Sequence, residues 1–305
     1  MTTDGALVVD KPAGWTSHDV VAKLRKIYGQ RRVGHAGTLD PDATGVLLVG
    51  LGRATRLLRF LQEAGKSYRG RIVFGIATST LDASGDVVEQ HPMPLTRSDV
   101  DTALRSFLGD IEQLPPMVSA VKVGGRRLHQ LARAGEDVER APRKVHVERI
   151  DVEGFDDGPY PTADVFVECG SGTYVRALAA DLGVALGGCA HLATLRRVSV
   201  GSFTLDEARP LARVETEPAA AVLTPAEAMR DLERIAVDDE QARAVRHGIA
   251  FPSGTLGESG DGPYAVVRAA PGPSELLAVY ERRGAACRPA VVLADGHDGG
   301  QDGEG

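Results

Sequence analysis

Short segments with alternating apolar and polar residues follow one another along much of the chain, with turns rather than helices between several of them. The clearest are at 66–75, 144–155, 162–169 and 195–203. Alternation with a period of two predicts strands that are buried on one face. The regular strand–helix rhythm of a doubly wound fold is absent. The sequence therefore predicts an α+β fold with a mainly antiparallel mixed sheet flanked by helices and loops.

Helix signals lie between these strands. Ser17 is expected to cap a helix whose apolar residues Val20, Val21 and Leu24 share one face. Thr96 is expected to start a second helix, which runs to Phe107. The glycine turn "GSGTYVR" at 170–176 should lead into a third helix.

Changes in composition divide the chain into parts. At 305 residues it is long enough for one large or two unequal domains. Residues 1–230 are predicted to form the larger domain, although the sequence becomes acidic and alanine-rich near 215. Short strand patterns predict a small β-rich module at 236–293. The last segment, 294–305, contains mainly glycine and acidic residues and is expected to be disordered.

Several features limit the cellular setting. No apolar run approaches the roughly 20 residues that span a membrane, and the N-terminus lacks a signal-peptide layout. Cys169, Cys189 and Cys287 are far apart and have no metal-ligand spacing. We therefore expect a reduced, cytoplasmic protein without a membrane anchor or a metal.

Charge is distributed unevenly. The whole chain carries a net charge of −7, but residues 1–150 hold 22 Lys/Arg and 17 Asp/Glu, whereas residues 151–305 hold 13 and 25. The basic residues of the first half are clustered, at 23–32, 53–59, 124–133 and 143–149. Each cluster alone could be an ordinary solvated face, but several together near glycine-rich loops favour a surface that binds phosphates.

The stretch "GHAGTLDPDATG" at 34–45 combines three glycines with two carboxylates. Glycine permits tight or left-handed backbone, and Pro41 disfavours helix at Asp40, so a tight loop is predicted. In its simplest interpretation Asp40 caps a turn and Asp42 is solvated. "DPDAT" also matches the DxDx[TV] motif of haloacid-dehalogenase-type phosphotransferases. That motif follows a buried strand, whereas here the apolar strand comes after the loop, so the match is disfavoured.

Five blocks occur in an order that matches a known family. The chain resembles the TruB-type bacterial tRNA pseudouridine synthases over about residues 6–210, through "VVDKPAGWTSHDVV" (8–21), "RVGHAGTLDPDATGVLLVGLGRATRL" (32–57), "KSYRGRIVFGIATSTLDASGDVV" (66–88), "LPPMVSAVKVGGRRLHQLARAGEDV" (114–138) and "CGSGTYVRALAADLG" (169–183). The resemblance implies a pseudouridine-synthase catalytic domain and a monomer that acts on the T-loop, at the elbow of tRNA. It implies conversion of uridine 55 to pseudouridine, without metal or organic cofactor.

The resemblance also assigns the reacting groups. It makes Asp40 the nucleophile, which attacks C1′ or C6 or acts through a glycal path, and it gives Asp42 no catalytic role. It implies that Arg176 pairs with Asp40. A cation is needed there because burial in a dry pocket would by itself raise the pKa of the carboxylate and leave it protonated. We therefore predict that the Arg176 guanidinium lies within salt-bridge reach of Asp40, with Tyr68 on the same pocket wall. Lys11 and Pro12 are expected to support the floor of the site.

Further residues carry over as substrate-binding groups. Tyr68 matches the tyrosine that stacks on the target base, and Tyr174 matches one that lines the pocket. Leu195 matches an apolar residue against the base, and His35 matches the histidine that helps to displace the target from its stack. Asp82 matches an acid in a turn that faces the T-loop. Flipping a base out costs a few kcal/mol, and stacking on an aromatic ring returns about 1–3 kcal/mol.

The basic segment 117–145 resembles a thumb-like insertion that grips RNA. Its cations are expected to contact phosphates: Arg126, Arg127, Arg133, Arg143 and Lys144. His129 stands where many relatives have tyrosine. The module at 236–293 resembles a PUA-type RNA-binding domain, although it shows no clear motif. An alternative to an enzyme is a non-catalytic RNA chaperone, which would not need Asp40.

Overall fold

The computed structural model describes residues 2–117, 122–123, 126–127, 138–268 and 274–293, the two dipeptides by their backbone alone. A ten-stranded sheet dominates it. Its strands are β1 (Gly5–Lys11), β2 (Val33–Ala36), β3 (Thr44–Leu51), β4 (Lys66–Phe74), β7 (Gly109–Gln113), β10 (Arg143–Asp156), β11 (Thr162–Cys169), β12 (Ala190–Val200), β13 (Phe203–Thr204) and β14 (Arg209–Pro210). Two-stranded pairs are formed by β5 (Ile76–Thr78) with β6 (Val87–Gln90) and by β8 (Lys122–Val123) with β9 (Arg126–Arg127).

The main path through the sheet runs β14-β1-β3-β12-β4-β11-β10-β7, with β2 and β13 attached at its side. Only β1–β14 and β3–β12 are parallel pairs within this sheet. The α+β class and the mainly antiparallel mixed sheet are therefore confirmed. The four strands that alternate in sequence lie next to one another in the order β12-β4-β11-β10. Of these, β10 and β11 are consecutive and form a hairpin, whereas β4 lies between β11 and β12, which are far from it in sequence.

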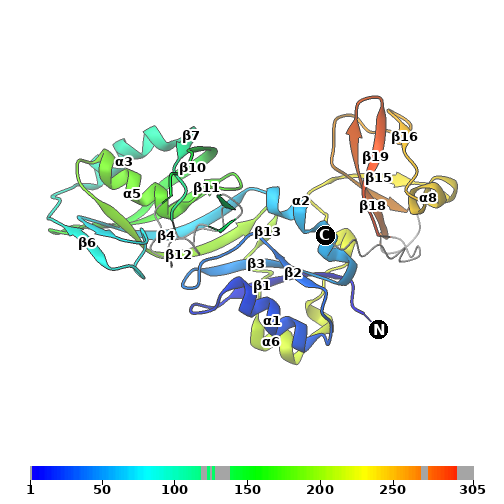
Figure 1. The fold of residues 1–305 in the computed structure, drawn as a ribbon, viewed down its shortest axis with the longest axis horizontal. Helices are drawn as coiled ribbons and strands as arrows, with labels where there is room; N and C mark the ends of the chain where they lie inside the picture. The colour runs from blue at the N-terminus through cyan, green and yellow to red at the C-terminus, as the bar shows by residue number, and fades with distance from the viewer. Residues whose placement is uncertain (1, 118–121, 124–125, 128–137, 269–273, 294–305) are drawn as a thin grey trace.

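Helices lie on the ten-stranded sheet in two groups, α1 (Ser17–Ile27) with α6 (Leu211–Thr216), and α3 (Arg97–Leu104) with α5 (Val175–Ala185) (Figure 1). The other helices are α2 (Leu58–Glu63), α7 (Pro225–Ala228) and, on the C-terminal module, α8 (Asp239–Arg246). The 3-10 turns are η1 (Gly52–Leu57), η2 (Arg105–Phe107) and η3 (Ala219–Ala221). Apolar residues of α1 form one core with β1 and β3, whereas those of α3 and α5 form another with β4, β10 and β11. The sheet thus joins two halves, each with its own core.

The N-cap of α1 differs from the prediction. Thr16, not Ser17, is the cap, and it forms a capping box in which Asp19 bonds back to the Thr16 backbone. The Ser17 hydroxyl instead bonds to the backbone of Leu39, accepting from its N–H at 3.0 Å and donating to its carbonyl at 3.2 Å. The start of α1 is thereby tied to the loop that precedes Asp40.

The two halves meet where β12 runs parallel to the start of β3. Gly45 lies there with a φ of +103°, and a Cβ at this position would come within 2.1 Å of the carbonyl oxygen of Arg197. Only glycine allows this close approach. The loop 37–43 between β2 and β3 is therefore placed at the junction of the two halves.

A second sheet of five strands forms the C-terminal module, in the order β15-β17-β18-β19-β16. The strands are β15 (Glu233–Val237), β16 (Phe251–Pro252), β17 (Tyr264–Arg268), β18 (Leu276–Arg283) and β19 (Ala286–Val292). β15 begins three residues before the predicted start of the module. The module shares a core with the larger domain, where Val267 and Val279 belong to the same cluster as Leu57 and Phe60. No helix in the described part of the chain is long and apolar enough to cross a membrane.

Candidate active site

The floor of the site is built from two neighbouring strands. On β4, Lys66 and Tyr68 are two residues apart and share one face, as do Leu195 and Arg197 on β12. Arg197 lies directly opposite Tyr68 in the antiparallel register. The motifs "KSYR" and "TLRRV" therefore come together because their strands pair.

The buried Lys11 supports the loop that carries Asp40. The ammonium of Lys11 donates hydrogen bonds to the carbonyls of Pro12 at 2.9 Å, Trp15 at 2.6 Å and Pro41 at 2.8 Å. All three ammonium protons are used, so the loop is fixed next to Asp40. Burial lowers the pKa of Lys11 to about 8. A role for Lys11 in supporting the floor of the site agrees with this geometry.

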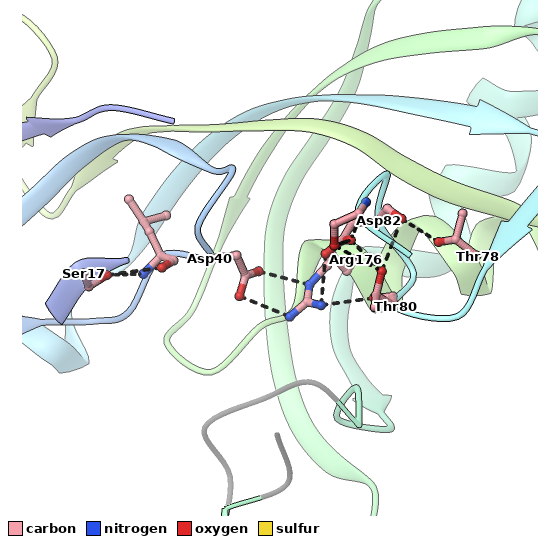
Figure 2. A network of polar contacts seen from close by, with 8 residues as sticks. Ser17, Asp40, Thr78, Thr80, Asp82 and Arg176 are labelled. Atoms are coloured by element: carbon pink, nitrogen blue, oxygen red, sulfur yellow. Dashed lines mark hydrogen bonds and ion pairs between the residues drawn. The ribbon is translucent and has the colours of Figure 1, made fainter. Parts of the chain in front are cut away.

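Arg176 faces two carboxylates at once (Figure 2). It stands in the first turn of α5, and only 4% of its side chain is exposed. Its Nε lies 3.0 Å from Oδ2 of Asp40, and its Nη2 lies 3.3 Å from Oδ1. Its Nη1 donates to Oδ2 of Asp82 and to the carbonyl of Thr80, each at 3.1 Å. The predicted ion pair with Asp40 is confirmed.

Asp82 orients the arginine from the other side. The turn 79–86 connects β5 to β6, and the carboxylate of Asp82 accepts hydrogen bonds from the Thr80 hydroxyl at 2.6 Å and from Ser84. Although burial alone would raise it, hydrogen bonds from Ser84 and Thr80 and the charge of Arg176 bring the pKa of Asp82 below its ordinary value. Asp82 is therefore a fixed negative charge that holds Arg176 in place.

Two opposing effects act on the pKa of Asp40. Its surroundings exclude water from part of the carboxylate and raise its pKa above the ordinary value, whereas Arg176 lowers it. About 40% of the side chain remains exposed along the pocket. Two guanidinium N–H groups face its two oxygens, and this bidentate arrangement fits the ionised carboxylate. A carboxylate held in this way can act as a nucleophile. Asp42 is exposed, as predicted.

A cavity of about 370 Å³ opens in front of Asp40. Its lining brings together six predicted site residues: His35, Asp40, Tyr68, Tyr174, Arg176 and Leu195. Tyr68 thus lines the same cavity as Asp40 and Arg176, whereas its place on the same wall stays a prediction. Asp82 is absent from the lining, but it holds Arg176 and its charge raises the pKa of Asp40. The volume lies in the range of small-molecule sites and can take a flipped base.

His35 stands at the pocket on β2. Its ring packs edge-to-face against His18, with centroids 5.3 Å apart, and its Nδ1 has no hydrogen-bond partner among the described residues. Burial lowers the pKa of His35 to about 4, so the ring is neutral at physiological pH.

The strand β2 that precedes the Asp40 loop is four residues long and antiparallel to β3. This context contradicts the phosphotransferase alternative, which requires a buried parallel strand there.

Sequence reasoning missed three residues at this site. Lys66 and Arg197 line the cavity, although both are almost completely buried. Gln113, at the end of β7, is 1% exposed and makes two hydrogen bonds to the backbone of Tyr174: its Oε1 accepts from the N–H at 3.0 Å, and its Nε2 donates to the carbonyl at 3.3 Å. "KSYR" and "TLRRV" contained a signal for the first two, since each lies two residues from a predicted site residue on the same strand.

Only some of the predicted phosphate contacts fall within the described structure. Arg143 and Lys144 are exposed at the start of β10, and Arg143 is the cross-strand partner of Gln113. Arg126 and Arg127 form the short strand β9. Arg133 lies outside the described residues, as does His129.

One cluster of possible metal ligands lies elsewhere, where atoms of Glu89, His91 and Cys189 are within 4.8 Å of one another. None of these residues lines the cavity in front of Asp40.

Comparison with protein families gives two matches. Residues 25–175 match the N-terminal domain of the TruB family of pseudouridylate synthases. Residues 176–232 match the C-terminal domain of tRNA pseudouridylate synthase B. Together these matches cover the Asp40 loop, the β4 and β12 strands and α5. The C-terminal five-stranded sheet lies beyond them.

Individual proteins show the same relationship. The chain is 46% identical over 297 residues to tRNA pseudouridine synthase B of Mycobacterium sp. strain KMS, covering 95% of this chain and 96% of the relative. It is 50% identical over 248 residues to the protein of that name from Symbiobacterium thermophilum, with 81% and 83% covered. Among solved structures, a Cbf5-Nop10-Gar1 complex matches with a TM-score of 0.70 and 28% identity, over 91% of this chain and 78% of that one.

Proposed function

We propose that this chain, which belongs to the TruB family of pseudouridylate synthases, isomerises the uridine at position 55 in the T-loop of tRNA. The N1–C1′ bond breaks, the uracil turns, and C5 bonds to C1′. The observation that carries the proposal is the bidentate contact between Arg176 and Asp40 in a cavity that Tyr68 and Leu195 also line.

The geometry gives each residue a task. Asp40 supplies the nucleophilic oxygen, and Arg176 keeps it ionised and fixes its direction. The ring of Tyr68 stacks on the flipped uracil, and Leu195 contacts the base. Tyr174 completes the wall at the start of α5. Because His35 is neutral and lies at the cavity, it can occupy the space of the displaced base without bringing a charge there.

The RNA is gripped outside the cavity. Arg143 and Lys144 project from β10 next to the residues that hold Tyr174, and they are suited to phosphates that flank the flipped nucleotide. We include Arg126, Arg127 and Arg133 in this surface on the strength of the sequence. The C-terminal sheet is proposed to act as a PUA-like module. We expect a cytoplasmic monomer whose reaction requires neither a metal nor an organic cofactor.

The test is Asp40→Asn, with Asp42→Asn as the matched control. An amide keeps the shape of the side chain but is a poor nucleophile. The Asp40 variant should bind tRNA normally but release no tritium from transcripts labelled at uracil C5, whereas the Asp42 variant should behave as wild type. Tritium release by the Asp40 variant within tenfold of wild type would refute the assignment. Normal RNA folding activity without tritium release in wild type would favour a chaperone.

A further inference from the structure

The wall of the cavity formed by β4 and β12 contains two buried cations. Lys66 is 7% exposed and Arg197 is 1% exposed, and both line the cavity. The two side chains lie close to each other beside Gly37. A Cβ placed on Gly37 would be 3.5 Å from Cε of Lys66 and 3.6 Å from Nη1 of Arg197. Two positive charges are therefore held together on one side of a site for a base.

No carboxylate neutralises this pair within the described part of the chain. Lys66 donates to the carbonyls of Gln62 at 2.9 Å and Ala64 at 2.7 Å. Arg197 donates from Nε to Val46 and from Nη2 to Gly37, again to carbonyls. The cation in direct contact with Asp40 is Arg176, which belongs to α5, whereas Lys66 and Arg197 belong to β4 and β12.

Buried charges without a counter-ion are unfavourable, so their retention at a binding site points to a ligand that becomes negative. When the N1–C1′ bond breaks, its electron pair stays on the uracil and spreads from N1 to O2 and O4. C1′ is then satisfied by a bond to the Asp40 carboxylate, or by a C1′–C2′ double bond formed when C2′ loses a proton. On either path the detached base is an anion until C5 bonds to C1′, which displaces the Asp40 carboxylate or is accompanied by return of a proton to C2′. C5 then loses its own proton to water.

We propose that Lys66 and Arg197 form a cationic wall that stabilises the detached uracil anion during the isomerisation. The proposal rests on the proposed function above and adds two catalytic residues to it. Donors placed in advance where negative charge develops are effective because they need not reorganise during the reaction. Asp40 and Arg176 would then act on the ribose side, and Lys66 and Arg197 on the base side.

Lys66 also bonds to carbonyls near the C-terminus of α2, and that contact alone could explain a lysine there. A capping lysine can be exposed, however, whereas Lys66 is buried at a cavity beside a second cation. Burial lowers the pKa of Lys66 to about 8, with the nearby charge of Arg197 acting in the same direction. The thiol of Cys169 also acts on Lys66, and the Tyr68 hydroxyl is hydrogen-bonded to Arg197. Burial raises the pKa of both the thiol and the hydroxyl.

The experiment compares Lys66→Met, Lys66→Arg and the surface control Arg213→Met, at an exposed cation of α6, in steady-state tritium release from labelled tRNA between about pH 6 and pH 9.5. The control should behave as wild type. Wild-type kcat should fall as pH rises through about 8, because neutral lysine cannot stabilise an anion. Lys66→Met should lower kcat by about 10- to 100-fold, change KM less than threefold and remove this alkaline decline. Lys66→Arg should keep most of kcat and also lose the decline.

The alternatives give different results. If Lys66 binds an RNA phosphate instead, Lys66→Met raises KM, leaves kcat unchanged and reduces the salt slope of binding by about one, which overturns the proposal. If it only caps α2, the melting temperature falls while kcat per folded molecule stays constant, which also overturns it. If Lys66→Met does not fold, the test rests on Lys66→Arg. The proposal is refuted if the kcat of Lys66→Arg still falls as the pH rises through about 8, as it does in wild type. Absence of wild-type activity on uridine 55 would instead refute the proposed function.

Discussion

Arg176→Lys tests the geometry of the site most severely among single conservative changes. The guanidinium contacts Asp40 through two nitrogens and donates to Asp82 and to the Thr80 carbonyl through the third. A lysine keeps the charge but presents a single ammonium, which cannot span both carboxylates in the same way. We expect the variant to fold, because Asp82 keeps its hydrogen bonds to Thr80 and Ser84.

The loss can be estimated from the contacts. A hydrogen bond to a charged group is worth about 1.5–3 kcal/mol. If one such contact to Asp40 is lost and the remaining one is misaligned, transition-state stabilisation falls by about 3 kcal/mol. At about 1.4 kcal/mol per decade of rate, this corresponds to a loss of kcat of about 100-fold. Binding of tRNA should be almost unaffected, because only 4% of the Arg176 side chain is exposed and its guanidinium is engaged with Asp40 and Asp82.

The pH dependence gives a second readout. Asp40 must be ionised to attack, so activity declines as the pH falls through its pKa. Burial already raises that pKa and Arg176 opposes the rise. With a poorer partner the pKa rises further, and the acid limb of kcat should move to higher pH. Single-turnover tritium release across pH measures both effects. A kcat within threefold of wild type with an unshifted acid limb would refute the role of the guanidinium.

Two other predictions concern Gln113 and the RNA surface. Gln113→Glu should lower kcat about tenfold near pH 8, because the carboxylate would repel the Tyr174 carbonyl, and kcat should recover at acid pH, where the protonated acid can donate to that carbonyl. Gln90→Glu, at an exposed glutamine, is the control. If the kcat of Gln113→Glu did not change with pH, the idea would be contradicted. Filter binding of Arg143→Glu/Lys144→Glu should show weaker tRNA affinity and a shallower salt slope than wild type, and an unchanged slope would remove both residues from the phosphate-binding surface.

The fold was predictable because its main signals are local. Alternation along β4, β10, β11 and β12 reports which face of each strand is buried, and the Asp40 loop is marked by its glycines. The cap of α1 was mistaken although its signal was present: Asp19, three residues after Thr16, completes a capping box, whereas Ser17 has no such partner.

The remaining features depend on contacts between distant segments. Gln113 is 61 residues from Tyr174, and a single glutamine at the end of a strand has no pattern that reveals such a partner. Asp82 meets Arg176 because its turn is bridged to Leu192 on β12, which sequence periodicity does not report. Burial of Lys66 and Arg197 likewise follows from the meeting of β3, β4 and β12.

The most direct test of the central claim is to map pseudouridine at nucleotide resolution in an unmodified tRNA transcript incubated with the purified protein. Carbodiimide modification followed by primer extension identifies each modified position. We predict one new stop that reports position 55, present with wild type and with Asp42→Asn, and absent with Asp40→Asn. Pseudouridine at another position, or at position 55 with the Asp40 variant, would contradict the account.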